Sequence, residues 1–407
     1  GYEPATVTAG QNVDVVMKEA GATQLKDMVV IGYGKAKKAD LTGSVTVMKP
    51  DELTKGVTNN ASDLLVGKVA GVDVQTDGGS PGAGAQIRIR GGASLSASND
   101  PLYVIDGLVI DNNTATGMSN ILANINPSDI ETFTVLKSAS ATAIYGSRAS
   151  NGVVIITTKK GSSGQRPTFS YNGDVTVSTV RKKYDTLNAS ELKKLAESKG
   201  IDTNLLGDAD TDWQDQIYRT AVSTDQNVTL TGAYKNLPYR VSLGYTKQQG
   251  VLKTSDYERY TASVSLNPTF FDDHLAVNFN AKGMYSKTSY ASTSAIGSAV
   301  SMDPTKPVYM NDDFYKQNFG GYFQYHSVVD RGDTAWGFSQ NSLSTHNPVH
   351  YLNEASDKGK GKELTGNIEL DYKIHGFEDL HIHMNAGMDL KSGKSNKEYS
   401  RYYYDNY

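Results

Sequence analysis

The chain has 407 residues, a formal net charge of −4 and no cysteine. This length can hold more than one domain, and the small net charge gives no bulk attraction to nucleic acid. The absence of cysteine excludes disulfides, thiol catalysis and thiolate metal sites. No apolar run approaches the ~20 residues that a membrane helix needs, which excludes a helical membrane protein and leaves a β-barrel open.

Tyrosine is used heavily, with 25 residues against 10 phenylalanines and 2 tryptophans. An aromatic belt at a membrane interface would produce this bias, because the tyrosine ring is apolar and its hydroxyl is hydrated. A tyrosine-rich binding surface on a secreted protein would produce it too. The bias alone does not separate these two classes of protein.

The first 34 residues contain short runs with strand character. Two of them, at residues 4–8 and 12–18, cannot bury a core by themselves, so residues 1–25 are interpreted as the end of a small β-domain. The next segment, KDMVVIGYG, contains the apolar run Met28–Ile31 between charged residues and glycine. On its pattern alone, this run predicts a buried strand.

Residues 71–161 alternate short apolar runs with turns of Gly, Ser, Asn and Asp. The pattern predicts strands at residues 85–90, 101–105, 130–136 and 152–159, and a short helix at 138–146. A small α+β domain follows from this order. The loop GGSPGAGAQ lacks both the third glycine of a dinucleotide-binding loop and the GK[ST] of a phosphate loop, so it predicts a turn.

After Gly161 the chain changes to long runs with strict period-two alternation. Leu380, Ile382 and Met384, for example, alternate with His381 and His383. Such runs are typical of membrane β-strands, which show lipid an apolar face and water a polar one. We predict about seven of these strands, near residues 168–180, 225–234, 239–249, 258–270, 275–287, 363–375 and 380–391.

The predicted connections alternate in length. Short turns fall at residues 234–238, 271–274 and 375–379, with a short link near 249–257, whereas long loops occupy 181–221 and 289–361. Short periplasmic turns opposite long extracellular loops are a second property of outer-membrane barrels. Since about seven strands cannot close a plugged barrel of about 22, we expect the chain to be the N-terminal part of a longer protein.

Two constellations invite a metal interpretation. Asp208, Asp210 and Asp212 precede a helical pattern but have Trp213 where a calcium loop of the EF-hand type needs glycine, so a capped loop is favoured. His381 and His383 share a strand face and could contact one metal ion, or could simply line a polar interior. No nucleophile elbow, HExxH helix or carboxylate pair is present, so we expect a protein that is not an enzyme and has no cofactor or metal.

Five motifs occur in order over roughly the first 160 residues. They are VVIGYG, RIRGG, PLYVIDG, INPSDIETFTVLK and SATAIYGSRASNGVVIITTKKG. Together they resemble the plug domain of SusC/RagA-type TonB-dependent outer-membrane transporters, and the resemblance becomes looser beyond them. It implies an α+β plug domain inside a transmembrane antiparallel β-barrel of about 22 strands, of which about seven belong to this chain.

The resemblance also implies a domain division. Residues 1–25 would be the C-terminal end of a β-sandwich N-terminal extension, 26–34 the Ton box, 35–161 the plug and 162–407 the first part of the barrel with its long extracellular loops. The Ton box is the segment that TonB, acting with ExbB and ExbD, captures by strand addition. Its residues here would be Asp27, Met28, Val29, Val30, Ile31 and Gly32.

The family implies two further groups of functional residues. Arg88, Arg90 and Arg148 would pair with carboxylates of the barrel wall, although on pattern alone they could be solvated charges. A ligand would bind above the plug and at the outer loops, for which the candidates are Ser94, Ser96, Asn99, Trp213 and Trp336.

The function expected from the resemblance is TonB-dependent import of a large nutrient, an oligosaccharide or an oligopeptide, across the outer membrane of a Gram-negative bacterium. A SusD-like surface lipoprotein would cover the barrel, outer-membrane lipid would surround it, and nucleic acid would not be a partner. The alternatives are a TonB-dependent signalling receptor and a secreted, soluble β-rich binding protein or adhesin. An iron-siderophore importer is a closer variant, for which no iron-ligand set is recognised.

Overall fold

The computed structural model describes most of the chain after residue 27. The described ranges are residues 28–31, 34–37, 45–49, 61–76, 79–91, 98–118, 122, 125–137, 142–330, 336–340 and 344–403. For residues 28–31, 34–37, 76, 328–330 and 336–340 the description covers the backbone alone. The expected end of a β-sandwich extension, residues 1–25, lies outside the described residues.

The first unit is built around a five-stranded sheet and is called the plug unit here (residues 45–158). Its strand order is β3-β8-β9-β6-β7, with β6 and β9 parallel and the other neighbours antiparallel. A hairpin of β4 and β5 adds its apolar residues to the same core. The elements are β3 (Val45–Met48), η2 (Ala61–Leu65), β4 (Val72–Thr76), β5 (Ala85–Ile89), β6 (Leu102–Ile105), β7 (Leu108–Ile110), η4 (Pro127–Asp129), β8 (Ile130–Leu136), η5 (Ala143–Ala149) and β9 (Val153–Thr158).

The central strand β9 is buried on both faces. Val154 and Ile156 pack into one apolar cluster, whereas Val153 and Ile155 pack into a second cluster on the other side of the sheet. A strand covered on both faces reads as a continuous apolar run rather than an alternating one, which explains VVIITT. The four predicted strands of this region are confirmed as β5, β6, β8 and β9, and the predicted helix overlaps η5, although residues 138–141 of the prediction lie outside the described residues.

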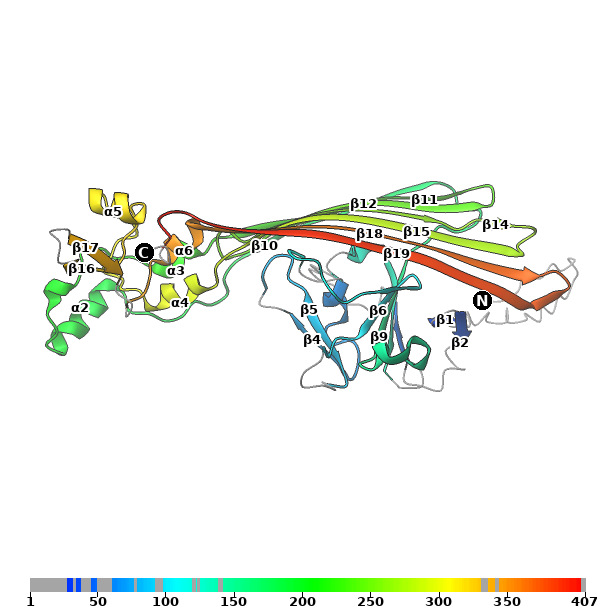
Figure 1. Cartoon of the computed structure of the whole chain (residues 1–407), viewed down its shortest axis with the longest axis horizontal. Coiled ribbons are helices and arrows are strands. Elements are labelled where there is room, and N and C mark those ends of the chain that lie inside the picture. The colour runs from blue at the N-terminus through cyan, green and yellow to red at the C-terminus, as the bar shows by residue number, and fades with distance from the viewer. Residues whose placement is uncertain are drawn as a thin grey trace, which may run out of the picture.

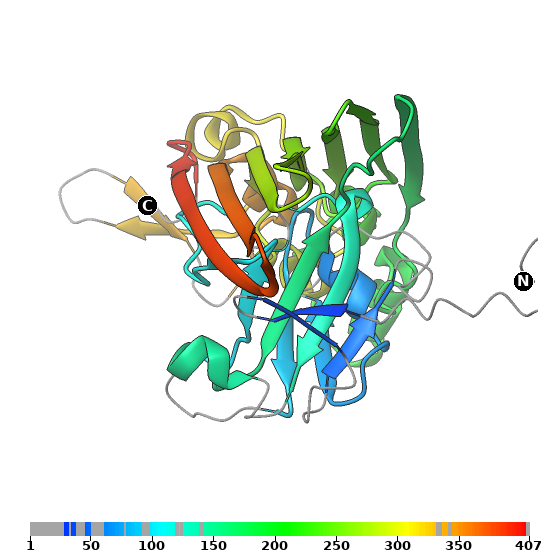
Figure 2. The same ribbon diagram turned by 90° about the vertical axis from the view of Figure 1, so that its right-hand side faces the viewer.

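The second unit is a sheet of long antiparallel strands, called the wall sheet here. Its order is β10-β11-β12-β13-β15-β18-β19, with the short β14 paired to β15. The sheet arches over the plug unit, which lies against its inner face (Figures 1 and 2). The strands are β10 (Thr168–Ser178), β11 (Ala221–Tyr234), β12 (Leu237–Gln249), β13 (Asp256–Leu266), β14 (Thr269–Phe270), β15 (Leu275–Tyr290), β18 (Ala355–Ile374) and β19 (Phe377–Tyr399).

The two faces of the wall sheet differ in polarity, as the alternation predicts. Leu243 and Ile382 on the outer face are 57% and 58% exposed, respectively. On the inner face, which faces the plug unit, the side chains of Asn227, Thr229 and Ser242 are buried and hydrogen-bond to one another. Because successive side chains of a strand point to opposite faces, one sequence supplies both surfaces.

The seven predicted wall strands are present, but five of them are longer than predicted. The largest differences are in β18, which begins at Ala355 instead of residue 363, and in β19, which ends at Tyr399 instead of residue 391; β11, β12 and β15 are longer by two to four residues. The added part of β18 has the sequence ASDKGKGK, in which lysine and glycine alternate. It has no apolar face, so hydrophobic periodicity could not reveal it, and the long loop predicted at 289–361 is correspondingly shorter.

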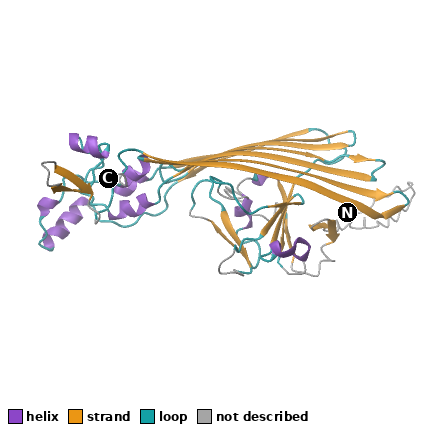
Figure 3. Cartoon of the chain, viewed as in Figure 1, coloured by secondary structure: helices purple, strands orange, loops and turns teal. Residues whose placement is uncertain are grey.

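The long connections fold into helices and short strands at one end of the wall sheet, called the loop unit here (Figure 3). Trp213 and Ile217 of the first connection pack against Ala295 and Leu352 of the second. The elements are α2 (Ala189–Ser198), η6 (Thr203–Leu205), α3 (Trp213–Ile217), α4 (Ser294–Ser301), α5 (Asp313–Phe319), β16 (His326–Asp330), β17 (Trp336–Gln340) and α6 (Pro348–Asn353). None of the described helices has the length and apolar composition needed to cross a membrane.

The opposite end of the wall sheet has short turns. Lys235 and Asn236 join β11 to β12, and His375 with Gly376 joins β18 to β19. A separate hairpin of β1 (Met28–Ile31) and β2 (Gly34–Lys37) lies near this end in both views (Figures 1 and 2). The predicted asymmetry between short turns and long connections is therefore present.

Three glycines of the wall sheet let the plug unit approach its backbone closely. A Cβ added at Gly393 would lie 2.1 Å from the carbonyl oxygen of Thr116, and one at Gly359 would lie 2.7 Å from that of Gly117. At Gly361 a Cβ would lie 2.5 Å from Cγ of Met118. Gly359 and Gly361 of β18, together with Gly393 of β19, thus form a seat for residues 116–118.

We expect Gly393→Ala to loosen this seat, because the new methyl group would overlap a backbone oxygen. The expected loss is about 1–3 kcal/mol in the free energy of unfolding of the plug unit, the usual cost of overpacking. Limited proteolysis within residues 111–118 of the purified protein measures it. Gly366→Ala in β18 is the matched control, because its Cβ would meet nothing closer than 3.5 Å. Equal cleavage of both variants would contradict the expectation.

Candidate functional site

The tip of the β6–β7 hairpin is the point where the plug unit touches the middle of the wall sheet. Asp106 and Gly107 form this tip with φ values of 48° and 85°, the left-handed pair that an Asp-Gly turn supplies. Asn367 of β18 donates a hydrogen bond to the Asp106 carbonyl at 2.8 Å, and Asn385 of β19 donates to the Gly107 carbonyl at 3.2 Å. The motif PLYVIDG therefore places its turn against two wall strands.

The Asp106 side chain is buried, with 3% of it exposed. The backbone N–H and the hydroxyl of Thr158 each donate to its carboxylate at 2.8 Å, and Lys282 of β15 forms an ion pair with it. Burial by itself would raise the pKa of Asp106, but the Lys282 charge and the Thr158 hydrogen bonds outweigh it, and the pKa lies below its usual range. The wall thus supplies the cation that keeps a plug carboxylate charged.

A second ion pair joins the two units near the start of β8. Arg240 of β12 places Nη2 at 2.7 Å from Oδ1 of Asp129, and both side chains are about nine-tenths buried. The hydroxyl of Ser263 donates to Oδ2 of Asp129 at 3.3 Å. Asp129 belongs to the motif INPSDIETF, where it ends the short helix η4.

A third cation of the wall, Arg259, reaches a plug carbonyl instead of a carboxylate. Its guanidinium is 1% exposed and donates to the carbonyl of Ile125 at 3.4 Å and to the hydroxyl of Thr246 at 2.9 Å. Asp225 of β11 lies 3.7 Å away and supplies the opposite charge from within the wall. The contact is therefore polar at three separate points.

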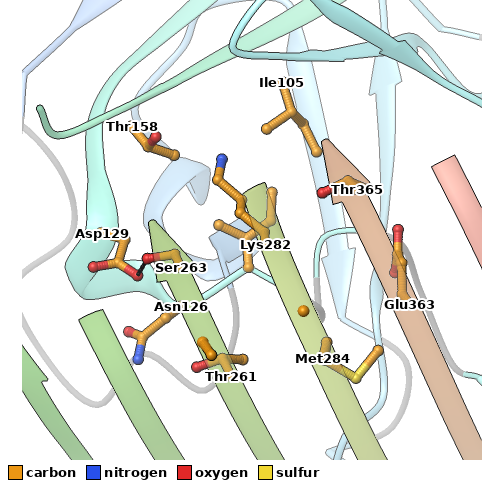
Figure 4. Close-up of a pocket in the computed structure, with 13 residues that line it drawn as sticks. Ile105, Asn126, Asp129, Thr158, Thr261, Ser263, Lys282, Met284, Glu363 and Thr365 are labelled. Atoms are coloured by element: carbon orange, nitrogen blue, oxygen red, sulfur yellow. Dashed lines mark hydrogen bonds between the residues drawn. The ribbon is translucent and has the colours of Figure 1, made fainter. Parts of the chain in front are cut away.

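A small cavity of about 40 Å³, partly open to solvent, lies between these contacts (Figure 4). Three of its lining residues carry charge: Asp129 from the plug unit, and Lys282 and Glu363 from the wall. Hydroxyls from both units share the lining with apolar groups, among them Ile105 and Met284. Where the two surfaces carry charged groups, water can solvate these groups again when the surfaces separate, which costs less than exposing apolar groups.

The arginines predicted to hold the plug lie elsewhere. Arg88 donates to Gln86 of its own strand at 3.1 Å, Arg90 is exposed at the end of β5, and Arg148 is exposed in η5. Within the described residues, the ion pairs between plug unit and wall have the opposite polarity, with the carboxylates on the plug and the cations on the wall. The proposed pairing of Arg88, Arg90 and Arg148 with wall carboxylates is not seen there and stays a prediction.

The predicted Ton box is only partly described. Met28–Ile31 forms β1 and pairs in antiparallel register with Gly34–Lys37, whereas Asp27 and Gly32 lie outside the described residues. One edge of β1 is used by β2. The role of this segment in capture by TonB stays a prediction.

The candidate substrate residues have different outcomes. Trp213 is 3% exposed, and its ring N–H donates to the carbonyl of Asp303 at 2.9 Å, so it lies in the core of the loop unit, and its role in ligand binding stays a prediction. Asn99 is half-buried in a segment that Asn151 holds by hydrogen bonds. Trp336 starts β17, described as backbone only, and Ser94 and Ser96 lie outside the described residues.

The metal interpretations also differ from the structure. Asp212 caps α3 by accepting a hydrogen bond from the N–H of Asp215 at 3.0 Å, which confirms the capped loop. His381 lies 2.6 Å from Asp371, and His383 lies 3.6 Å from the same carboxylate. In the described residues, no group of three or more such side chains is placed to hold a metal ion.

The comparisons with known proteins agree with this geometry. Residues 37–153 match the family model described as the TonB-dependent Receptor Plug Domain. TonB-dependent receptor SusC of Bacteroides thetaiotaomicron is 52% identical over 410 residues, covering 100% of this chain and 41% of the relative. TonB-dependent receptor P3 of Formosa agariphila is 38% identical, covering 77% of this chain and 31% of the relative.

The same architecture is found in solved structures. The RagAB peptide importer in its open-open state superimposes with a TM-score of 0.71 and 25% identity, covering 91% of this chain and 43% of the importer chain. The chain thus spans about two-fifths of SusC and of the importer chain, and within that span the plug unit and the wall sheet occur together. With its plug domain, its antiparallel wall strands and its identity to SusC, the chain belongs to the SusC/RagA-type family of TonB-dependent receptors.

Proposed function

We propose that the protein to which this chain belongs is an importer in the outer membrane of a Gram-negative bacterium, energised by TonB. TonB, with ExbB and ExbD, captures Met28–Ile31 by strand addition and pulls on it, and the plug unit moves to open a path along the wall. The observation that carries this proposal is the polar contact between plug unit and wall. A plug unit held against the wall by ion pairs and hydrogen bonds can be displaced without opening an apolar core.

The cargo is proposed to be a large polar nutrient, an oligosaccharide or an oligopeptide. The loop unit has an aromatic-rich core and lies at the end of the wall sheet away from the short turns, which in outer-membrane barrels is the extracellular end. The RagAB relative is a peptide importer by name, which favours oligopeptides, and the name SusC does not specify a cargo. A SusD-like lipoprotein over the loop unit is the proposed partner.

The soluble alternative is opposed by the outer face of the wall sheet. Leu380, Ile382, Met384, Met388 and Leu390 on β19 are all at least half exposed. An apolar surface of this extent on a soluble protein would promote association or precipitation. Lipid surrounding the outer face removes that problem.

Capture by TonB can be tested by a substitution that removes a single backbone N–H group from the captured segment. Strand addition uses N–H groups of the captured segment, and proline has none. We expect Val30→Pro, like deletion of residues 27–32, to abolish growth on the imported nutrient while the protein still reaches the outer membrane. Val30→Thr keeps the N–H and is the matched control. Uptake at the normal rate in the deletion mutant would exclude the proposed energy coupling.

The Asp106–Lys282 pair should hold the plug closed. Lys282→Met leaves a buried carboxylate without its cation, and we expect a loss of about 3–5 kcal/mol in the free energy of unfolding of the plug unit. The double variant Asp106→Asn with Lys282→Met should recover much of this loss, because no unpaired charge remains. Chemical denaturation in micelles measures the free energy of unfolding of the single and the double variant. Conductance in planar bilayers measures the ion flow that results when the plug no longer closes the path. Lys316→Met, on the exposed face of α5, is the control; a double variant no better than the single one would refute the role of the pair.

The same carboxylate predicts an acid dependence. The folded-state pKa of Asp106 is lowered, so its contribution to stability is fully present above the unfolded pKa of about 4 and is lost as pH falls through the lower folded pKa. We expect the difference in unfolding free energy between the unmodified protein and Asp106→Asn to be constant near neutral pH and to shrink below about pH 4. Denaturation curves at several pH values test this, and a difference that grows on acidification would contradict it.

A further inference from the structure

The outer face of the wall sheet changes in composition along the strands. From the short-turn end, the outward residues of β15 are Leu275, Val277, Phe279, Ala281 and Gly283. Their partners on β18 and β19 are also mostly apolar, up to the row that contains Leu364 and Leu390. Nine residues of an antiparallel strand rise about 27 Å, which at the usual tilt spans about 20 Å of the apolar band of about 25 Å in an outer-membrane barrel.

A row of tyrosines ends the apolar zone toward the loop unit. Tyr245, Tyr260 and Tyr285 are successive partners on β12, β13 and β15, and their ring centroids lie 5.1 Å and 6.4 Å apart. Tyrosine rings in this position are typical of the aromatic belt at a membrane interface. The belt fixes the height at which lipid headgroups begin.

Lysines occupy the outer face in the tyrosine row and directly beyond it. Lys287, Lys360 and Lys394 are successive partners on three neighbouring strands. Lys358 and Lys362 lie one outward position to either side of Lys360 on β18, and Lys362 is the direct partner of Tyr285. All five are exposed. Lys360 and Lys362 flank Gly361, whose contact with Met118 marks the inner face, so the lysines point away from the plug unit. These five residues are called the lysine band here.

Among the residues that the structure describes, none of the five lysines forms an ion pair with a carboxylate of the wall. The row of the lysine band continues through Glu258 to Lys247, and these two side chains lie 3.9 Å apart, so the one acidic residue of the row already has a cation. Like charges on directly opposite residues destabilise a sheet, and three lysines in a row carry this cost twice. By contrast, Lys282 of the same strand β15 faces inward and is paired with Asp106. An external anion would remove the repulsion.

We propose that the lysine band binds the phosphate-bearing headgroup of a lipid in the outer leaflet of the outer membrane. The proposal rests on the orientation given under the proposed function, since the band lies on the loop-unit side of the apolar zone. An exposed ammonium is a point charge that suits phosphate groups at variable positions. The apolar zone and the tyrosine row below the band would contact the acyl chains of the same lipid.

The test uses the full-length protein in phosphatidylcholine nanodiscs doped with diphosphoryl lipid A or with its dephosphorylated form. Lipid retention on titration, followed by native mass spectrometry, gives the affinity. Lys287, Lys360 and Lys394 are changed together to glutamine. The control changes Lys182, Lys194 and Lys199 to glutamine, which removes the same charge from exposed positions of the loop unit. Each lysine near an anionic lipid surface contributes about fivefold, so the band variant should bind roughly a hundredfold more weakly.

The expected result is selective retention of the phosphorylated lipid by the unmodified protein and by the control, and its loss in the band variant. Equal retention of the two lipids, or unchanged binding by the band variant, would overturn the proposal. Crosslinks from the band to a second copy or to another protein would overturn it too. Membrane insertion and heat-modifiable mobility are measured on the same samples, because a failure there would refute the proposed function, whereas inserted protein without lipid selectivity refutes only the lysine band.

Discussion

A buried carboxylate needs a cation and hydrogen-bond donors, and Asp106 obtains them from two different units. Thr158 of the plug unit supplies two donors, and Lys282 of the wall sheet supplies the charge. Neither unit alone satisfies the group, so the tip of the β6–β7 hairpin is in its stable environment only when the plug unit is seated. Asp129 repeats the arrangement with Arg240, and Asn367 and Asn385 add neutral contacts to the turn. The position of the plug unit therefore depends on paired charges.

This arrangement explains why the wall sheet has such unequal faces. The inner face must offer amides, hydroxyls and cations to the plug unit, and in the proposed displacement of the plug unit water would replace these partners. The outer face has no such partner and is apolar over the middle of each strand. Period-two alternation lets each strand meet both requirements. Where the inner face must approach the plug backbone closely, as at Gly359 and Gly393, side chains are removed altogether.

The sequence predicted those parts of the fold that depend on hydrophobic pattern. Strands β5, β6, β8 and β9 of the plug unit and the seven wall strands follow from apolar runs and alternation, whereas β4 and β7 were not predicted. The first residues of β18 were missed because ASDKGKGK has no apolar face. The ion pairs were missed for a different reason: a lone Arg240 or Lys282 on a polar strand face cannot be matched to Asp129 or Asp106 without knowing the register between units. The two aspartates lie within the motifs PLYVIDG and INPSDIETF, and this was the one available signal.

The order of strands in the plug sheet also has a mechanical meaning. β3, the strand of this sheet nearest in sequence to Met28–Ile31, lies at one edge, whereas the β6–β7 hairpin that carries Asp106 lies at the other. β3 is short and pairs with β8 alone, from Val45 opposite Leu136 to Met48 opposite Phe133. A force applied through Met28–Ile31 would act on this edge first and would break the β3–β8 hydrogen bonds in sequence, while β8, β9, β6 and β7 stayed in contact with the wall. Unfolding under force would thus begin at β3, and the ion pair of Asp106 with Lys282 would be the last of these contacts to break.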